Sequence, residues 1–232
     1  MTPQERRQQP AGSHSVDAAR KTNDGSVSNG SGALSSRDLI LNAARTLISS
    51  HGYDGMVISD LSEQSGLPPS SIYYHFGNKL GVLVALLERT FEDLHASFPS
   101  PSAFDGSPPL ERFELWFTAA CTALDQRPEY LRLLIAVSIG SHADADTVRG
   151  TVRRIRDYGY ASWVEALTPV FAPVDSPEDT ELVERLAVLG RAMTDGLSVA
   201  TSFDGTTYVS HVPAFVALVR GFAEDRQRAR RR

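Results

Sequence analysis

Tyr73-Tyr74-His75 is a short run of hydrogen-bonding side chains, and Lys79 follows four residues after it. Phenol hydroxyls, an imidazole N–H and an ammonium group are all suitable donors to phosphate oxygens. Pro69, Ser70 and Ser71 stand immediately before the run, where a helix would begin and face base edges. These residue types at this spacing favour contact with DNA.

Such side chains must be held by a rigid scaffold, and the flanking pattern predicts one. Two short helices are expected at 58–65 and 69–75, with Gly66 supplying a tight turn between them. Pro69 is tolerated in the first turn of the second helix, because its missing N–H would have no partner inside the helix. The segment therefore predicts a helix-turn-helix whose second helix enters the major groove. A plain helical hairpin with an aromatic core is the alternative.

A preceding helix is expected to begin at Ser35 or Ser36 and to end at His51-Gly52. Ser35 with Asp38 approximates a capping box, and the apolar residues that follow have helical spacing. A fourth helix is expected at about 78–97, with a continuous apolar stripe. The Pro- and Ser-rich segment that follows is not expected to form regular structure.

The stretch from Gly52-Tyr53 through Gly66 to Lys79 resembles the signature of TetR-family transcriptional regulators. The resemblance is close over about residues 35–95 and architectural beyond them. It places structural roles on Gly52, Tyr53, Leu61, Gly66, Ile72 and Phe76. It implies DNA contacts at Ser59, Pro69, Ser70, Ser71, Tyr73, Tyr74, His75 and Lys79.

The sequence departs from the family pattern at both helix starts. Met56-Val57-Ile58 offers no hydroxyl before Ser59 to cap the first short helix, and Pro68 opens the second in place of Ser, Thr or Asp. The base-facing turn also lacks Arg, Asn and Gln, the strong bidentate readers of guanine and adenine. We therefore expect modest direct readout, with thymine-methyl contacts, DNA shape and the chain's tails contributing more.

The charge distribution gives the DNA-binding region a weak electrostatic footprint. The chain has a net charge of −5, which argues against a general nucleic-acid coat protein. Residues 35–80 hold three cations against four carboxylates. Arginines in the N-terminal arm and in the C-terminal tail could supply the missing charge. They could equally be solvated, with the C-terminal arginines favouring the helix dipole.

No alternating apolar pattern of convincing length occurs, so the predicted fold class is all-α. Further helices are expected at 110–125, 128–139, 144–170, 178–201 and 209–228. An N-terminal three-helix helix-turn-helix DNA-binding domain would precede a larger helical ligand-binding and dimerisation domain. The expected divisions are a disordered arm 1–34, a DNA-binding domain with its linking helix 35–97, a connector 98–109, the larger domain 110–225 and a basic tail 226–232.

The larger domain is not a DNA surface, since residues 104–223 hold 10 basic and 16 acidic side chains. The resemblance implies that its last two long helices form a four-helix homodimer interface, although their apolar stripes could instead pack within the subunit. The expected apolar surface comprises Leu182, Leu186, Leu189, Ala192, Met193, Leu197, Val212, Phe215, Val216, Val219 and Phe222. Gly190, Gly196 and Ala200 are small residues that would permit close helix approach.

An effector pocket in this domain would be lined by aromatic and apolar residues, which could equally be plain core. The candidate ligand-binding residues are Trp116, Phe117, Tyr130, Leu134, Tyr158 and Trp163, with Tyr160 and Phe171 as further aromatic candidates. A pocket of this kind suits a hydrophobic or aromatic small molecule. Its binding would favour a conformer in which the linking helices of the dimer splay apart.

Other classes of function have little support. The sequence has none of the usual hydrolase, zinc-protease or phosphate-loop motifs, so no catalytic residue, metal site or cofactor is expected. His142, Asp144 and Asp146 could in principle bind a metal, but they also suit a helix start. Cys121 is alone and lies in an apolar helical pattern, typical of a buried inert thiol; a redox or ligand-sensing role is the alternative.

The apolar segments are too short to cross a membrane, and no secretory signal follows Met1, so a cytoplasmic location is expected. The sequence thus predicts a ligand-responsive repressor that binds a palindromic double-stranded DNA operator as a homodimer. The alternative is a helical protein-interaction module without DNA affinity.

Overall fold

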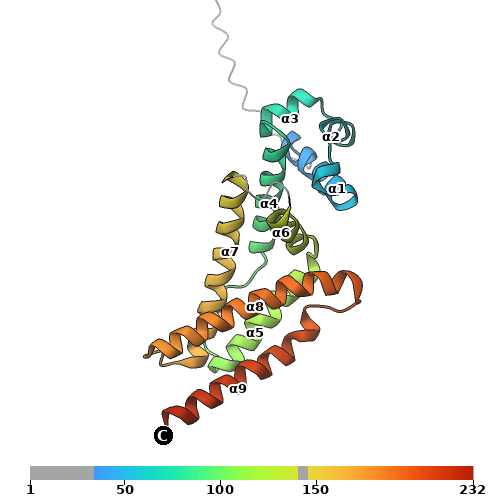
Figure 1. Cartoon of the computed structure of the whole chain (residues 1–232). Helices are drawn as coiled ribbons and strands as arrows, with labels where there is room; N and C mark the ends of the chain where they lie inside the picture. Colours follow the sequence, from blue (N-terminus) through green and yellow to red (C-terminus); the bar gives the residue numbers. More distant parts are fainter. Residues whose placement is uncertain (1–33, 141–145, 232) are drawn as a thin grey trace, which may run out of the picture. The chain divides into compact units, whose positions relative to one another are not determined.

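The computed structural model describes residues 34–140 and 146–231, which belong to one compact unit that begins at Leu34. Within these ranges all regular structure is helical, as the sequence predicts (Figure 1). The expected N-terminal arm, apart from Leu34, and the segment with His142 and Asp144 lie outside the described residues. None of the described helices is long and apolar enough to cross a membrane.

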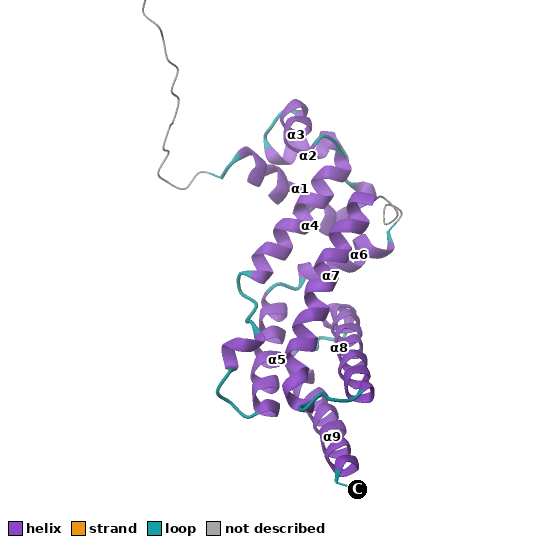
Figure 2. Ribbon diagram, turned by 90° about the vertical axis from the view of Figure 1, so that its left-hand side faces the viewer, coloured by secondary structure: helices purple, strands orange, loops and turns teal. Residues whose placement is uncertain are grey.

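The α-helices run in this order: α1 (Ser36–Gly55), α2 (Ile58–Ser65), α3 (Pro69–Phe76), α4 (Lys79–His95), α5 (Pro109–Gln126), α6 (Glu129–Ile139), α7 (Asp146–Leu167), α8 (Pro177–Phe203) and α9 (Val212–Arg230). Three short 3₁₀ helices lie between them: η1 (Pro101–Phe104), η2 (Thr168–Phe171) and η3 (Val209–His211). Figures 1 and 2 place α1–α3 at one end of this unit and α9 at the other.

Proline explains where the helices differ from expectation. The long helix expected at 144–170 is α7 followed by the 3₁₀ turn η2, because Pro169 cannot continue an α-helical ladder. The last helix is preceded by η3, and Pro213 stands in its first turn. The connector at 98–109 is more ordered than expected: it contains η1, and Trp116 Nε1 donates to the Pro99 carbonyl at 3.2 Å.

The capping expectations for the first helices hold. Ser35 accepts a hydrogen bond from the Asp38 backbone N–H at 3.1 Å, which fixes the start of α1. Val57 precedes α2 without a side-chain cap, as the missing hydroxyl predicted. Gly52 breaks α1 with a φ of 71° and a ψ of 172°, and the assigned helix resumes as far as Gly55.

The helices enclose two hydrophobic clusters that share α4. The smaller one holds α1–α3 together and includes Ile40, Leu61, Ile72, Val82 and Leu86, all 1% exposed or less. Val82 and Leu86 come from one face of α4. Leu83, Leu87 and Leu94, from its other face, belong to the larger cluster. A displacement of α4 therefore changes the position of the helix-turn-helix relative to the larger core.

The larger cluster is centred on packed rings from α5, α7 and α9. Phe113, Trp116, Phe117, Trp163 and Phe215 have neighbouring ring centroids 5.0–6.4 Å apart. Such aromatic contacts add directional packing to the burial of apolar area.

Several residues expected on a dimer face lie inside the subunit instead. Leu186, Val212, Phe215, Val216 and Val219 are buried in the larger cluster. Gly190 is also buried, and it permits close approach to Trp163 of the same chain rather than to a partner: an added Cβ would lie 2.6 Å from the indole ring. Helical periodicity identifies an apolar face but not what covers it.

Candidate DNA interface and ligand cavity

The α2–α3 motif positions its polar face by burying the opposite one. Leu61 on α2 and Ile72 on α3 are both fully buried. Gly66 adopts the left-handed conformation between them, with φ 70° and ψ 15°, which is favourable for glycine. The Ser62 hydroxyl donates to the Leu67 carbonyl at 2.7 Å and further fixes the turn. The motif predicted from sequence is therefore present with its expected turn residue.

Most of the expected DNA-contact residues of α2 and α3 are exposed to solvent. Tyr74 is 85% exposed and Tyr73 is 51% exposed. Ser59, Pro69, Ser70 and His75 are also exposed, whereas Ser71 and Lys79 are half-buried. Two large aromatic side chains left in solvent contribute little to the core and are available to a partner.

Lys79 begins α4 and reaches back to the end of α1. Its Nζ donates to the Asp54 carbonyl at 3.1 Å and lies 4.4 Å from the centroid of the Tyr53 ring. An ammonium group has three N–H donors, so these contacts fix its place without using all of its hydrogen-bonding capacity. Asn78 caps the same helix by accepting from the Gly81 backbone N–H at 2.9 Å.

Sequence reasoning missed Arg37 as a neighbour of the recognition helix. Arg37 is exposed on α1, and its guanidinium carbon lies 5.7 Å from the centroid of the Phe76 ring on α3. Only packing of α1 against α3 brings this cation there, so the local motif gave no signal for it.

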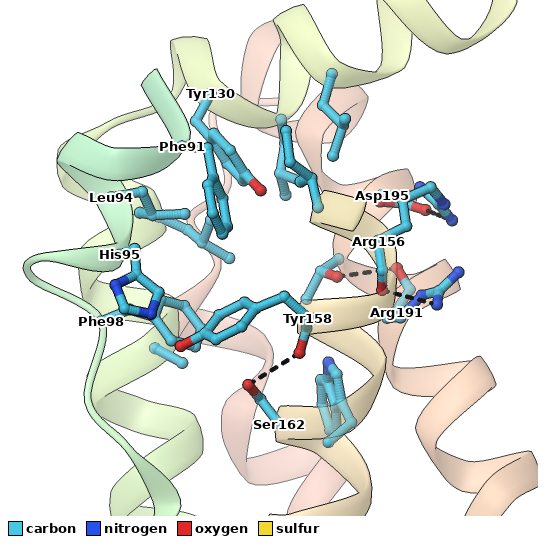
Figure 3. A pocket seen from close by; sticks show the side chains of 18 of the residues that line it. Phe91, Leu94, His95, Phe98, Tyr130, Arg156, Tyr158, Ser162, Arg191 and Asp195 are labelled. Atoms are coloured by element: carbon cyan, nitrogen blue, oxygen red, sulfur yellow. Dashed lines mark hydrogen bonds and ion pairs between the residues drawn. The ribbon is translucent and has the colours of Figure 1, made fainter. Parts of the chain in front are cut away.

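All six candidate ligand-binding residues line one cavity, of about 90 Å³, between α4, α5, α6, α7 and α8 (Figure 3). They are Trp116, Phe117, Tyr130, Leu134, Tyr158 and Trp163. The two further candidates do not line it. Phe171 is buried in the larger cluster, and Tyr160 is half-buried on α7, where the Arg191 guanidinium carbon lies 5.9 Å from its ring centroid.

Sequence reasoning also missed the contribution of α4 to this cavity. Phe91, Leu94 and His95 form the wall that faces Tyr158 (Figure 3). The ring centroids of His95 and Tyr158 are 4.7 Å apart, and those of Phe91 and Tyr158 are 5.5 Å apart. The apolar stripe of α4 was visible in the sequence, but which of its residues face a cavity depends on how α7 packs against it.

The polar side chains of the lining are mostly paired with each other. Arg156 on α7 forms an ion pair with Asp195 on α8 at 2.9 Å, and Arg191 donates to the Arg156 carbonyl at 3.2 Å. Burial and the nearby Arg156 lower the pKa of Arg191. Cys121 also lines the cavity; burial raises the pKa of its thiol to about 12, so it stays protonated at neutral pH, as an inert buried thiol should.

The fold and these sites define a class of protein. A helix-turn-helix with an exposed polar recognition helix is followed by a larger helical body that encloses an aromatic cavity. That combination is typical of DNA-binding proteins that respond to small molecules.

Comparison with known proteins places the chain within that class. The family model for bacterial regulatory proteins of the tetR family matches residues 40–86. The HTH-type transcriptional repressor KstR of Rhodococcus jostii is 26% identical over 159 residues, or 68% of either chain. The repressor AcnR of Corynebacterium efficiens is 38% identical over 61 residues, which cover 26% of this chain and 32% of AcnR.

Solved structures extend the likeness of fold to about four-fifths of the chain. A TetR-like regulator from Rhodococcus sp. RHA1 matches with a TM-score of 0.63 at 15% identity, over 81% of this chain and 96% of that one. FadR of Bacillus subtilis, solved in complex with stearoyl-CoA, matches with a TM-score of 0.58 at 17% identity. This match covers 78% of this chain and 96% of FadR. Residues 40–86 thus match the DNA-binding region of the tetR family, and the chain is a DNA-binding transcriptional regulator.

Proposed function

We propose that the chain is a ligand-responsive repressor that binds a palindromic DNA operator as a homodimer. Residues 35–97 would form the DNA-binding domain with its linking helix, and residues 110–225 the ligand-binding and dimerisation domain. The likeness to KstR and AcnR, both named as transcriptional repressors, supports repression as the mode of action.

In this proposal α3 lies in the major groove of the operator. Its first turn faces base edges, and the hydroxyls of the exposed tyrosines and the Lys79 ammonium donate to phosphates. The proposed DNA contacts are Ser59, Pro69, Ser70, Ser71, Tyr73, Tyr74, His75 and Lys79. The exposure of Tyr73 and Tyr74 supports this assignment, because neither ring is needed by the core.

The dimer would form through apolar side chains that α8 and α9 leave exposed. Val188, Ala192, Val199 and Phe203 follow one another at spacings of four, seven and four residues, which puts them on one face of α8. Val188, Val199 and Phe203 are 53%, 55% and 83% exposed. On α9, Leu218 and Phe222 are one turn apart and more than 40% exposed. Such apolar stripes on two consecutive helices favour burial against a second copy.

The observation that carries ligand response is the position of α4. This helix contributes to both hydrophobic clusters, and its second half lines the cavity through Phe91, Leu94 and His95. The cavity of about 90 Å³ is smaller than the roughly 300–1,000 Å³ usual for ligand pockets. A bound effector would therefore enlarge it by moving its walls, and α4 would carry that movement to the helix-turn-helix.

An effector can shift the equilibrium between the DNA-binding conformation and the conformation with α4 displaced only to the extent that it binds the two with different affinity. FadR of Bacillus subtilis holds stearoyl-CoA, an acyl compound, in its solved complex, and this supports an apolar ligand in folds of this kind. The aromatic lining of the present cavity supports a hydrophobic small molecule here as well.

Iterative selection from random-sequence duplex DNA, at about 0.1–0.15 M salt to suppress weak charge-driven binding, tests the proposal. We expect an enriched palindrome whose half-sites lie about one helical turn apart, or a multiple of that spacing. Absence of enrichment, together with absence of binding at lower salt, would refute sequence-specific DNA binding by this chain.

A further inference from the structure

Tyr130 brings an unpaired hydroxyl into the ligand cavity. It lies in the first turn of α6, is 6% exposed, and points its Oη toward the middle of the cavity (Figure 3). Across residues 34–140 and 146–231, the structure gives this hydroxyl no hydrogen-bond partner. Because the Oη faces the cavity, a polar atom of a molecule bound there can reach it.

The hydroxyl is a hydrogen-bond donor at neutral pH. Burial is the largest influence on Tyr130, and with the nearby Asp195 carboxylate it raises the pKa of the phenol far above its usual value. The group therefore remains protonated and offers its O–H to an acceptor, such as a carbonyl, ether or hydroxyl oxygen.

The rest of the lining favours a flat, uncharged molecule. Trp116, Phe117, Tyr158 and Trp163 give the walls aromatic faces, which stack well on rings. Arg156 and Asp195 pair with each other at 2.9 Å and so neutralise one another. The remaining cation, Arg191, donates to a backbone carbonyl and lies near Tyr160, which is not part of the lining.

We infer that the effector is an uncharged aromatic molecule with an oxygen that accepts a hydrogen bond from the Tyr130 hydroxyl, and that Tyr130 determines specificity for that oxygen. The inference rests on the proposed ligand response and names the class of ligand for the same cavity. Because the hydroxyl lacks a partner in the described structure, a ligand oxygen gains a hydrogen bond there without displacing one within the protein.

A pair of probes matched in shape tests this inference. We would measure the dissociation constants of 2-naphthol and 2-methylnaphthalene for the full chain in the absence of DNA. Trp116 and Trp163 are the only two tryptophans of the chain, and both line the cavity, so quenching of their fluorescence reports binding at this site. The preference is the dissociation constant of 2-methylnaphthalene divided by that of 2-naphthol.

We expect Tyr130→Phe to lower this preference about three- to tenfold, the range for loss of one neutral hydrogen bond. Comparing the same two probes in both proteins cancels their difference in hydrophobicity. Tyr160→Phe is the matched control, since Tyr160 does not line the cavity, and it should leave the preference unchanged. Tyr130→Phe should not lower the melting temperature, because the lost hydroxyl has no partner among the described residues.

An equal preference in wild type and Tyr130→Phe, or failure of both probes to bind the wild type, would overturn the inference. Tighter binding of the 2-naphthoate anion than of 2-naphthol would overturn the assignment of an uncharged ligand. These results are independent of the DNA selection. An enriched palindrome with an unchanged preference would refute only the role of Tyr130. The expected change without DNA binding would support that role and refute the repressor.

Discussion

Arg226 near the end of α9 forms an ion pair with Asp179 in the first turn of α8, with its Nη2 2.6 Å from the Asp179 Oδ1. Arg230 approaches the other carboxylate oxygen at 3.0 Å and also donates to the Phe171 carbonyl at 3.0 Å. The Asp179 side chain is 1% exposed, so this is a buried pairing. Two arginines that the sequence placed in a basic tail thus join α9 to α8 and to the turn before it.

This pairing predicts an acid-sensitive contribution to stability. Burial alone would raise the pKa of Asp179, but hydrogen bonds from Arg230, Arg226 and Ser176 outweigh it and hold the pKa at about 2, below the ordinary 3.8. A depressed pKa stabilises the fold above the ordinary value, and the stabilisation is lost as pH falls from about 4 to 2. Urea denaturation should show about 2 kcal/mol lost over that window through this group.

Asp179→Asn should remove that pH-dependent part and lower the free energy of unfolding at pH 7 by about 3 kcal/mol, because two arginines lose their buried partner. Glu181→Gln is the control on the same helix, since Glu181 pairs with Arg185 in an exposed contact. It should cost less than about 1 kcal/mol. Equal losses of unfolding free energy in the two variants would show that the buried Asp179 pairing stabilises the fold no more than an exposed ion pair does.

Gly190 predicts a second stability effect, because its close contact with Trp163 leaves no room for a methyl group. Gly190→Ala must push the indole or α8 aside, at a cost of about 1–3 kcal/mol for overpacking. The change should also shift tryptophan emission, since Trp163 lines the cavity. Thermal unfolding and fluorescence spectra together check both outcomes.

Gly150→Ala is the matched control. Gly150 lies in α7, and an added Cβ there would meet nothing within 4 Å. Alanine is a better helix former than glycine, so this variant should be stabilised by up to about 1 kcal/mol. A destabilised Gly150→Ala, or an unaffected Gly190→Ala, would contradict the packing described for α7 and α8.

The order of the helices could be read from the sequence because its signals are local. Gly66 and Pro69 mark the turn and the start of α3, and the bounds of α2 follow from them. Ser35 and Asp38 mark the start of α1 for the same reason. Pro169 was equally visible in the sequence. The predicted helix nevertheless continued through it, because the long apolar periodicity around this proline is also typical of an uninterrupted helix.

Contacts between distant segments could not be read in this way. Gly190 was expected to face a partner subunit, and it instead accommodates Trp163, 27 residues earlier in the chain. Tyr130 and Tyr158 were named as cavity candidates by residue type alone. That the Tyr130 hydroxyl lacks a partner while Arg156 has one depends on how α6, α7 and α8 meet, and no local pattern encodes that geometry.

The dimer proposal predicts that a charge on the exposed face of α8 separates the subunits. Val199→Arg should give a monomer at concentrations where the wild type is a dimer, because an unpaired charge cannot be buried in an apolar interface. Sedimentation equilibrium measures this directly. Leu115→Arg changes a similarly apolar, 41% exposed residue on α5 and should leave the assembly unaltered. A dimeric Val199→Arg would exclude this face as the interface.

Substitutions at Tyr74 and Ser71, both on α3, should affect DNA binding in different ways. Tyr74→Ala should weaken binding to all DNA sequences about tenfold, since a phosphate contact carries no sequence information. Ser71→Ala should weaken binding to the selected palindrome more than to scrambled DNA, because Ser71 belongs to the base-facing turn. Competition titrations with both DNAs measure the two ratios. Equal losses for Ser71→Ala on both DNAs would contradict a base-reading role.

Substitution of Lys79 should change the salt dependence of DNA affinity rather than the sequence preference. Lys79→Gln removes one cation, so the slope of log affinity against log salt should become shallower by about 0.9. The variant also loses the contact with the Asp54 carbonyl, so its melting temperature should be measured alongside.

Lys79→Arg keeps the charge and should retain the wild-type slope even if the geometry at α1 is altered. An unchanged slope in Lys79→Gln would show that this ammonium group acts only within the protein, by joining the start of α4 to the end of α1. In that case the phosphate contacts of this surface must come from other donors, and exposed Arg37 beside α3 would be the first to test.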